Sequence, residues 1–184
     1  NRTDRMVAAE LMSSAYCNMQ CKYCYIPKVQ EMKDLHKDVI EDIKSDRPLE
    51  TLKKVYGEQL EVLSLWGTEP TLVLDYFTPN LHKYVEAFPR LEEFMFSTNL
   101  LTHTDTIYRF LSKVNELGEQ HGRKFKMDLQ ISLDGPDFIT DKNRQEGATK
   151  KILENYDKLT TWLKDQSMKN IQVAIGFKPT FTMD

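Results

Sequence analysis

The chain has 184 residues, of which 40% are hydrophobic and 29% charged, and its formal net charge is −3. This length fits one domain with a buried core, and no apolar run approaches the ~20 residues that span a bilayer. The N-terminal stretch is charged and lacks the apolar core of a signal peptide, while Lys and Arg are spread along the chain. We therefore expect neither a membrane nor a nucleic-acid partner.

The first third of the chain predicts two strands separated by a loop and a helical region. Residues 6–12 are an apolar run that predicts the first strand, and a polar, cysteine-rich loop follows from residue 13 to about residue 33. Residues 34–56 carry apolar side chains at helical spacing, interrupted at Pro48, which predicts one broken helix or two helices. Residues 60–66 (LEVLSLW) predict the second strand.

The middle of the chain continues the alternation of helix and strand. Residues 79–87 predict a helix, and residues 93–97 predict a short aromatic strand. Residues 105–117 have the periodicity of a longer helix, for which Gly118 is the expected C-cap.

The last third predicts strand, helix and strand at residues 125–133, 149–164 and 171–177. Repeated βα units favour a parallel sheet with helices outside it. Five strands are too few for an eight-stranded barrel, which typically needs ~250 residues. We therefore predict an α/β fold, a partial (β/α) TIM-like barrel with about five βα units, whose ligand site lies at the C-terminal ends of the strands. The last strand is expected to be an exposed edge.

The chain has three cysteines, Cys17, Cys21 and Cys24, which all lie within eight residues. An odd number in one tight cluster is a poor disulfide framework and indicates a metal or redox site in a reducing, cytoplasmic compartment. In the spacing C-x3-C-x2-C, three thiolates can hold three irons of a [4Fe-4S] cluster and leave the fourth open to a chelating ligand. Zinc, with His36 or His82 as the fourth ligand, is an alternative, as is a structural or electron-carrying iron–sulfur site.

Tyr23 stands before the last cysteine, and together with the three cysteines it resembles the signature of the radical SAM superfamily. The resemblance implies that the open iron binds the amino and carboxylate groups of S-adenosylmethionine (SAM). It also implies reductive cleavage of SAM to a 5′-deoxyadenosyl radical, which abstracts hydrogen from a substrate. A reducing electron donor such as flavodoxin or ferredoxin is the partner expected from this chemistry.

Gly67, Thr68, Glu69 and Pro70 follow the second predicted strand and look like the GGEP motif that contacts the SAM amino group in that family. A glycine lets the backbone approach a ligand, and a carboxylate pairs with an ammonium group. Thr68 departs from the family pattern and restricts the turn. The same four residues are also compatible with an ordinary turn.

Ser97, Thr98 and Asn99 end the third predicted strand and resemble the S-T-N motif at the same place in the family. By this resemblance, Ser97 and Asn99 are expected to bind the cofactor. All three residue types are also good helix N-caps, and the two roles are compatible.

The segment Ser132-Leu-Asp134-Gly-Pro resembles the S-L-D-G-P segment of peptide-modifying radical SAM enzymes, which include the anaerobic sulfatase-maturing enzymes. The resemblance implies that Ser132 contacts SAM and that Arg144 pairs with the SAM carboxylate, for which a planar guanidinium is well suited. Asp134 is expected either to contact the bound ligands or to hold the Gly-Pro turn that follows it.

Together, these residues predict a radical SAM enzyme that acts on a peptide or protein side chain. The alternatives are a small-molecule or nucleoside substrate, and a non-catalytic module that binds a cluster or zinc. No catalytic side chain is predicted. Because no cysteine follows Cys24 and a sixth strand is missing, residues 1–184 are expected to be a radical SAM core domain, either truncated at its C-terminal end or unusually short.

Overall fold

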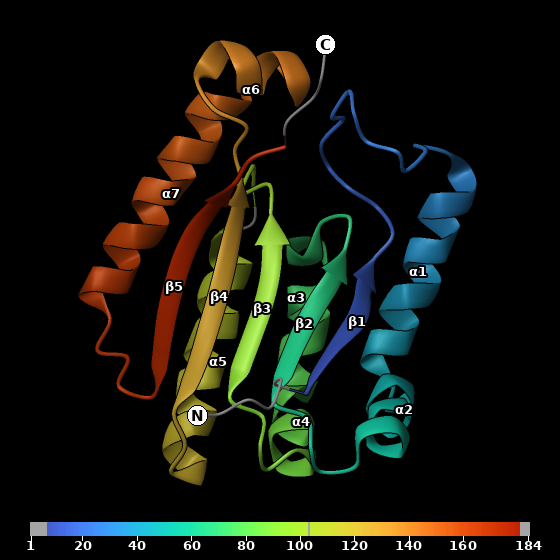
Figure 1. Cartoon of the computed structure of the whole chain (residues 1–184), viewed down its shortest axis with the longest axis vertical. Coiled ribbons are helices and arrows are strands. Elements are labelled where there is room, and N and C mark those ends of the chain that lie inside the picture. The colour runs from blue at the N-terminus through green and yellow to red at the C-terminus, as the bar shows by residue number, and fades with distance from the viewer. Residues whose placement is uncertain (1–6, 103, 181–184) are drawn as a thin grey trace.

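Five parallel strands lie side by side in the order β1-β2-β3-β4-β5 and form one sheet, which does not close within the described residues (Figure 1). The computed structural model describes residues 7–102 and 104–180. The strands are β1 (Ala8–Ser14), β2 (Val62–Gly67), β3 (Glu93–Thr98), β4 (Phe125–Ser132) and β5 (Ile171–Lys178). The prediction of a parallel, incomplete barrel is therefore confirmed, and residue 6 of the first predicted strand lies outside the described residues.

Helices pack against one face of the sheet and along its two sides. The helices are α1 (Gln30–Lys44), α2 (Arg47–Tyr56), α3 (Leu74–Phe77), α4 (Leu81–Ala87), α5 (Thr104–His121), α6 (Asp137–Asn143) and α7 (Ala148–Asp165). In Figure 1, α3, α4 and α5 lie behind the sheet, α1 and α2 lie beside β1, and α7 lies beside β5. Across residues 7–102 and 104–180, no helix combines the length and apolar character that crossing a membrane requires.

The helical region around Pro48 forms two helices rather than one. Pro48 occupies the first turn of α2, where its missing N–H has no intrahelical partner to lose. Ser45, the C-cap of α1, donates from its backbone N–H to the carbonyl groups of Glu41 and Asp42. The break between α1 and α2 therefore comes from the position of Pro48, which the sequence shows.

Alternation along the strands separates a buried face from an open one. Side chains such as Leu63, Phe94 and Leu129 point to the helices and are fully buried. On the opposite face, the strand register places Glu10, Ser64, Met95 and Asp128 in one row across four strands. In a closed barrel this mixed row would face the interior, whereas here no described helix covers it.

The predicted C-cap at Gly118 is wrong, because α5 continues through it to His121. Gly118 is buried, and a Cβ atom there would lie 2.5 Å from the Cβ atom of Asn170 and 2.8 Å from the carbonyl oxygen of Arg123. The glycine is therefore required for close packing inside the helix. Gly122, with φ +63°, adopts the left-handed conformation just after the helix ends.

Two short helices, α3 and α6, are absent from the prediction, and the predicted start of the helix at residue 79 is two residues early. α3 has 4 residues and α6 has 7, which is too short for apolar periodicity to emerge. A tight turn of 3-10 type at Thr78–Asn80 precedes α4.

Replacing Gly118 with Ala should destabilise the fold by about 1–3 kcal/mol, the usual range for overpacking a filled site. This loss should outweigh the gain in helix propensity of ~1 kcal/mol. Gly176→Ala is the matched control, because nothing lies within 4 Å of a Cβ atom at Gly176. Urea unfolding of both variants checks the prediction, and a Gly118→Ala variant as stable as the control would contradict it.

Candidate functional site

A cavity of about 520 Å³ lies at the C-terminal edge of the sheet, where the sequence places its unusual polar residues. Eleven of the thirteen predicted site residues line it: Cys17, Cys21, Tyr23, Cys24, Gly67, Thr68, Glu69, Ser97, Asn99, Ser132 and Arg144. The other two predicted site residues, Pro70 and Asp134, are described by the structure but do not line the cavity. The loop after β1 and the ends of β2, β3 and β4 thus contribute to one concave surface.

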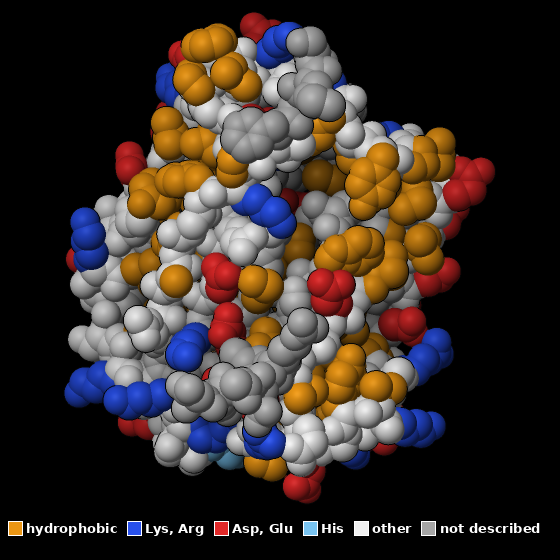
Figure 2. All heavy atoms as spheres, viewed as in Figure 1, with side chains coloured by type: hydrophobic (Ala, Val, Ile, Leu, Met, Phe, Trp, Pro, Cys, Tyr) orange, Lys and Arg blue, Asp and Glu red, His pale blue; other side chains and the backbone are white. Residues whose placement is uncertain are grey.

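The cavity also has lining residues that were not predicted as site residues: Met19, Tyr25, Ile26, Thr98, Lys178 and Thr180. Met19 is buried, whereas Tyr25 is 84% exposed, and both line the cavity beside the cysteines. Figure 2 shows hydrophobic side chains gathered on this face over the loop between β1 and α1. Nothing in the local sequence distinguishes these apolar residues from ordinary loop residues. The presence of Lys178 and Thr180 in the lining is expected from their position at and just after the end of β5.

The cysteine loop is held in place by hydrogen bonds from both sides. The N–H of Lys22 donates to the carbonyl oxygen of Asn143 at 2.7 Å, which links the loop to the end of α6. The N–H of Ala15 donates to Nδ1 of His36 on α1 at 3.3 Å. Within the loop, the N–H of Cys24 donates to the carbonyl oxygen of Cys21 at 3.1 Å and forms a turn. The backbone of the cysteine loop is therefore attached to α1 and to the end of α6.

The three thiols have different surroundings. Nδ2 of Asn99 donates to Sγ of Cys17 at 3.6 Å, and Nη1 of Arg144 lies 4.0 Å from Sγ of Cys21. Cys24 is exposed. Burial raises the pKa of the Cys17 and Cys21 thiols, although the nearby Arg144 charge opposes the rise at Cys21. Binding of a metal centre would therefore release protons from these two side chains.

The donor set fits an iron–sulfur cluster better than a zinc ion. No group of three His, Cys, Asp or Glu side chains among the described residues is already arranged to hold a metal ion. The three thiols nonetheless line one cavity, and thiolates are soft ligands suited to iron–sulfur clusters and zinc. His36 and His82 are not among the described residues of the lining, so neither completes a zinc tetrahedron there.

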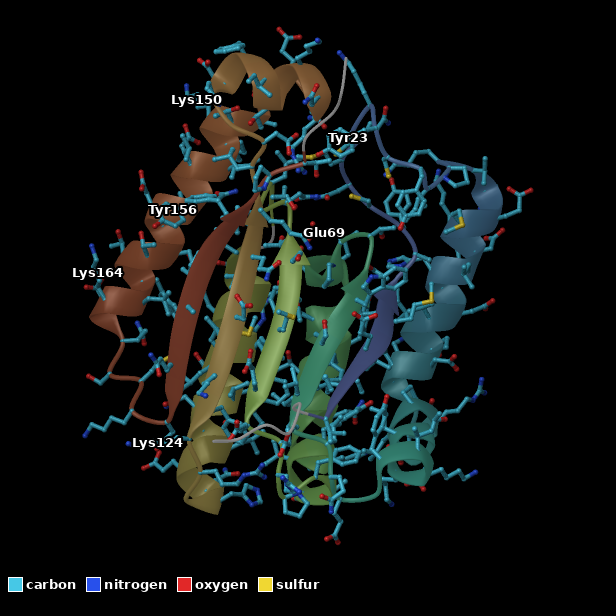
Figure 3. The ribbon with its side chains drawn as sticks, viewed as in Figure 1. Tyr23, Glu69, Lys124, Lys150, Tyr156 and Lys164 are labelled. Carbon is cyan, nitrogen blue, oxygen red and sulfur yellow. The ribbon has the colours of Figure 1, made fainter. Side chains whose placement is uncertain are left out.

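Glu69 connects the turn after β2 to the end of β3 (Figure 3). Its side chain is buried, and Oε1 accepts hydrogen bonds from the hydroxyl groups of Thr71 and Thr98 at 2.6 and 2.7 Å. Oε2 accepts from the N–H of Asn99 at 2.7 Å. Burial raises the pKa of the Glu69 carboxyl, and these hydrogen bonds oppose the rise. The Glu69 side chain therefore links the turn after β2 to the segment at the end of β3. Its contact with the SAM amino group stays a prediction.

Gly67 and Thr68 bring the end of β2 against the end of β1. Gly67 has φ +146°, and a Cβ atom there would lie 2.6 Å from Oγ of Ser14. The hydroxyl of Thr68 donates to the carbonyl oxygen of Tyr16, next to the first cysteine. The glycine is required for close approach, and the threonine that departs from the family pattern ties this turn to the cysteine loop.

Arg144 follows α6 and is 6% exposed. Its Nη2 atom forms an ion pair with Oδ1 of Asp134 at 2.6 Å, and the Asp134 side chain is completely buried. The carboxylate of Asp134 thus faces protein groups rather than the cavity. Ser132, which pairs with Lys178 in the register of β4 and β5, lines the cavity beside it.

Comparison with solved structures finds the same fold in an enzyme of known class. Native anSMEcpe, an anaerobic sulfatase-maturating radical SAM enzyme, with bound AdoMet and the Cp18Cys peptide, matches with a TM-score of 0.56 and 17% identity. The match covers 92% of this chain and 41% of that chain. The same enzyme with AdoMet and the Kp18Cys peptide matches with a TM-score of 0.49 and 17% identity, and the match covers 92% of this chain and 51% of that one.

The comparison confirms the fold expected from the radical SAM resemblance, and this chain spans about two-fifths of the length of the first enzyme chain. No protein-family model matches the sequence, and no curated protein matches it either.

The raised pKa of Glu69 predicts a pH dependence of stability. A carboxyl whose pKa is raised by folding contributes stability below its unfolded pKa of about 4.3, and this contribution is lost as the pH rises through the folded pKa. The free energy of unfolding of the wild type, relative to Glu69→Gln, should therefore fall as the pH rises above about 4.3.

Urea unfolding of the two proteins across this range measures the difference. Glu116→Gln is the control, because hydrogen bonding to Lys113 lowers the pKa of the exposed Glu116 and its small effect should have the opposite sign. A difference between wild type and Glu69→Gln that rises with pH would contradict the assignment.

Proposed function

We propose that this chain is the core domain of a radical SAM enzyme. Cys17, Cys21 and Cys24 hold a [4Fe-4S] cluster, SAM occupies the cavity, and a peptide or protein side chain is the substrate. The observation that carries the proposal is that the three thiols and the ends of four parallel strands line a single cavity. A one-electron donor such as flavodoxin or ferredoxin and a reducing, cytoplasmic compartment belong to the same proposal.

The likeness in fold supports the proposal beyond the cysteine loop. The solved enzyme with the TM-score of 0.56 holds both AdoMet and a peptide. The S-L-D-G-P segment, which includes Ser132 and Asp134, lies after β4 and adds a resemblance to peptide-modifying members. A peptide substrate is therefore favoured over a nucleoside or a small metabolite.

Different residues of the chain would bind the carboxylate and the amino group of SAM. The guanidinium of Arg144 and the hydroxyl of Ser132 would bind the carboxylate, and the backbone at Gly67 and Thr68 would approach the amino group. Asn99 donates to Cys17, and the buried side chain of Met19 lines the cavity beside the cysteines. When bound, the cluster and SAM would supply one-electron cleavage of the S–C5′ bond and a 5′-deoxyadenosyl radical for hydrogen abstraction.

Anaerobic reconstitution with iron and sulfide tests the proposal. The wild type should take up about four irons per chain and should release 5′-deoxyadenosine from SAM when dithionite is added. Each of Cys17→Ser, Cys21→Ser and Cys24→Ser should lose most of the iron and all of the SAM cleavage, because each removes one thiolate ligand. Iron content, electron paramagnetic resonance and product chromatography provide the measurements.

His82→Asn is the control for the zinc alternative, because His82 lies on α4 and its Nδ1 atom contacts the carbonyl oxygen of Pro79. This variant should keep its iron and its SAM cleavage. A wild type that binds one zinc ion in place of iron, or an iron-loaded wild type that leaves SAM intact, would overturn the proposal.

Arg144→Lys should weaken SAM binding about 10- to 100-fold, because a hydrogen bond to a charged group contributes about 1.5–3 kcal/mol and Lys cannot make the forked contact. Iron content should stay at the wild-type value. Arg109→Lys is the control, since Arg109 makes a similar forked contact with Asp75 on the surface. Isothermal titration of the reconstituted proteins measures the affinity, and loss of iron in Arg144→Lys would contradict the assigned role.

A further inference from the structure

Asp134 is a charged residue whose side chain has no exposed surface, and it follows the end of β4 after one intervening residue. A carboxylate removed from water is costly to the fold unless hydrogen bonds and an opposite charge compensate for it. Asp134 is outside the set of described residues that line the cavity, although its neighbours Ser132 and Arg144 belong to that set. Its role must therefore be found in the protein groups that surround it.

Three separate segments of the chain donate hydrogen bonds to the Asp134 carboxylate. The hydroxyl of Tyr23, from the cysteine loop, donates to Oδ2 at 3.0 Å (Figure 3 labels Tyr23). Nη2 of Arg144, after α6, donates to Oδ1 at 2.6 Å, and the N–H of Thr180, after β5, donates to Oδ1 at 3.0 Å. One buried carboxylate thus joins the segments that follow β1, α6 and β5.

The guanidinium of Arg144 contacts Asp134 and the Tyr23 ring, and its Nη1 atom lies 4.0 Å from Sγ of Cys21. Its Nη2 atom is held by Asp134, and its Cζ atom lies 5.5 Å from the centre of the Tyr23 ring. Its Nε atom is buried and has no hydrogen-bond partner within the part of the chain that the structure describes. Leaving a buried N–H without a partner is costly to the fold, so this donor would gain a hydrogen bond if a ligand acceptor reached it.

We propose that Asp134 is a positioning residue that holds the Arg144 guanidinium ready for the carboxylate of the bound ligand, and so sets the preference of the site for SAM over an analogue without that carboxylate. The inference rests on the proposed function. Asp134 itself touches neither ligand nor cluster and acts through Arg144. A guanidinium that is already oriented loses less rotational freedom when the ligand binds, so the pairing with the carboxylate is stronger.

The test compares two ligands on the reconstituted holoprotein: SAM, and decarboxylated SAM, which lacks the α-carboxylate. A second-sphere substitution typically costs 10- to 100-fold, so Asp134→Asn should weaken SAM binding by about that factor. Its affinity for decarboxylated SAM should stay at the wild-type value. The ratio of the two affinities is the decisive readout, because general loosening of the fold weakens both ligands alike.

Two further variants keep the test decisive if Asp134→Asn folds poorly. Tyr23→Phe removes one hydrogen bond to Asp134 without changing any charge, and it should reduce the preference for SAM in the same direction but less. Asp141→Asn is the matched structural control, because Asp141 accepts hydrogen bonds from Gly147 and Thr149 at the start of α7. It should lower stability while leaving the ratio of affinities unchanged.

The outcomes separate this inference from the proposed function. Asp134→Asn and Tyr23→Phe proteins that keep the full wild-type preference for SAM would overturn the positioning role alone, and so would an equal loss for both ligands. A wild type that takes up no iron, or binds neither ligand, would overturn the proposed function and this inference with it.

Discussion

Parallel pairing is the constraint on which the site depends. When all strands of a sheet run in one direction, their carboxyl ends meet at one edge, and loops that are far apart in the sequence become neighbours. The cysteine loop after β1 therefore lines one cavity with Gly67 at the end of β2, Asn99 just after β3 and Ser132 at the end of β4. Without this pairing, the three thiols would not share a cavity with residues from the other strands.

Two buried carboxylates stabilise this edge, and they act on different sides of it. Glu69 accepts hydrogen bonds from Thr98 and Asn99 and connects the turn after β2 to β3. Asp134 connects the end of β4 to Tyr23 and Arg144. Leaving a buried polar group without its partners is costly, so these hydrogen bonds tie the segments at this edge of the sheet to one another.

Much of this arrangement follows from patterns that are local in the sequence. Apolar runs and helical periodicity predict the five strands and the longer helices, and the cysteine spacing predicts the loop that lines the cavity. The burial of Asp134 is not predictable in this way, because its partners Tyr23 and Thr180 lie far from it along the chain. The predicted C-cap at Gly118 is wrong for the same reason. The atom that leaves no room for a larger side chain at Gly118 belongs to Asn170, which lies outside the helix.

The contacts that join the cysteine loop to the other side of the sheet have a consequence for how the protein folds. Tyr23 and Asp134 are 111 residues apart, and Cys21 and Arg144 are 123 residues apart. Contacts of such sequence separation form late, because closing long loops costs entropy before any contact compensates for it. Because Ser132, Arg144 and Lys178 line the cavity, it is complete only after β4 and β5 have joined the sheet, and a growing chain exposes its three cysteines before the cavity around them exists.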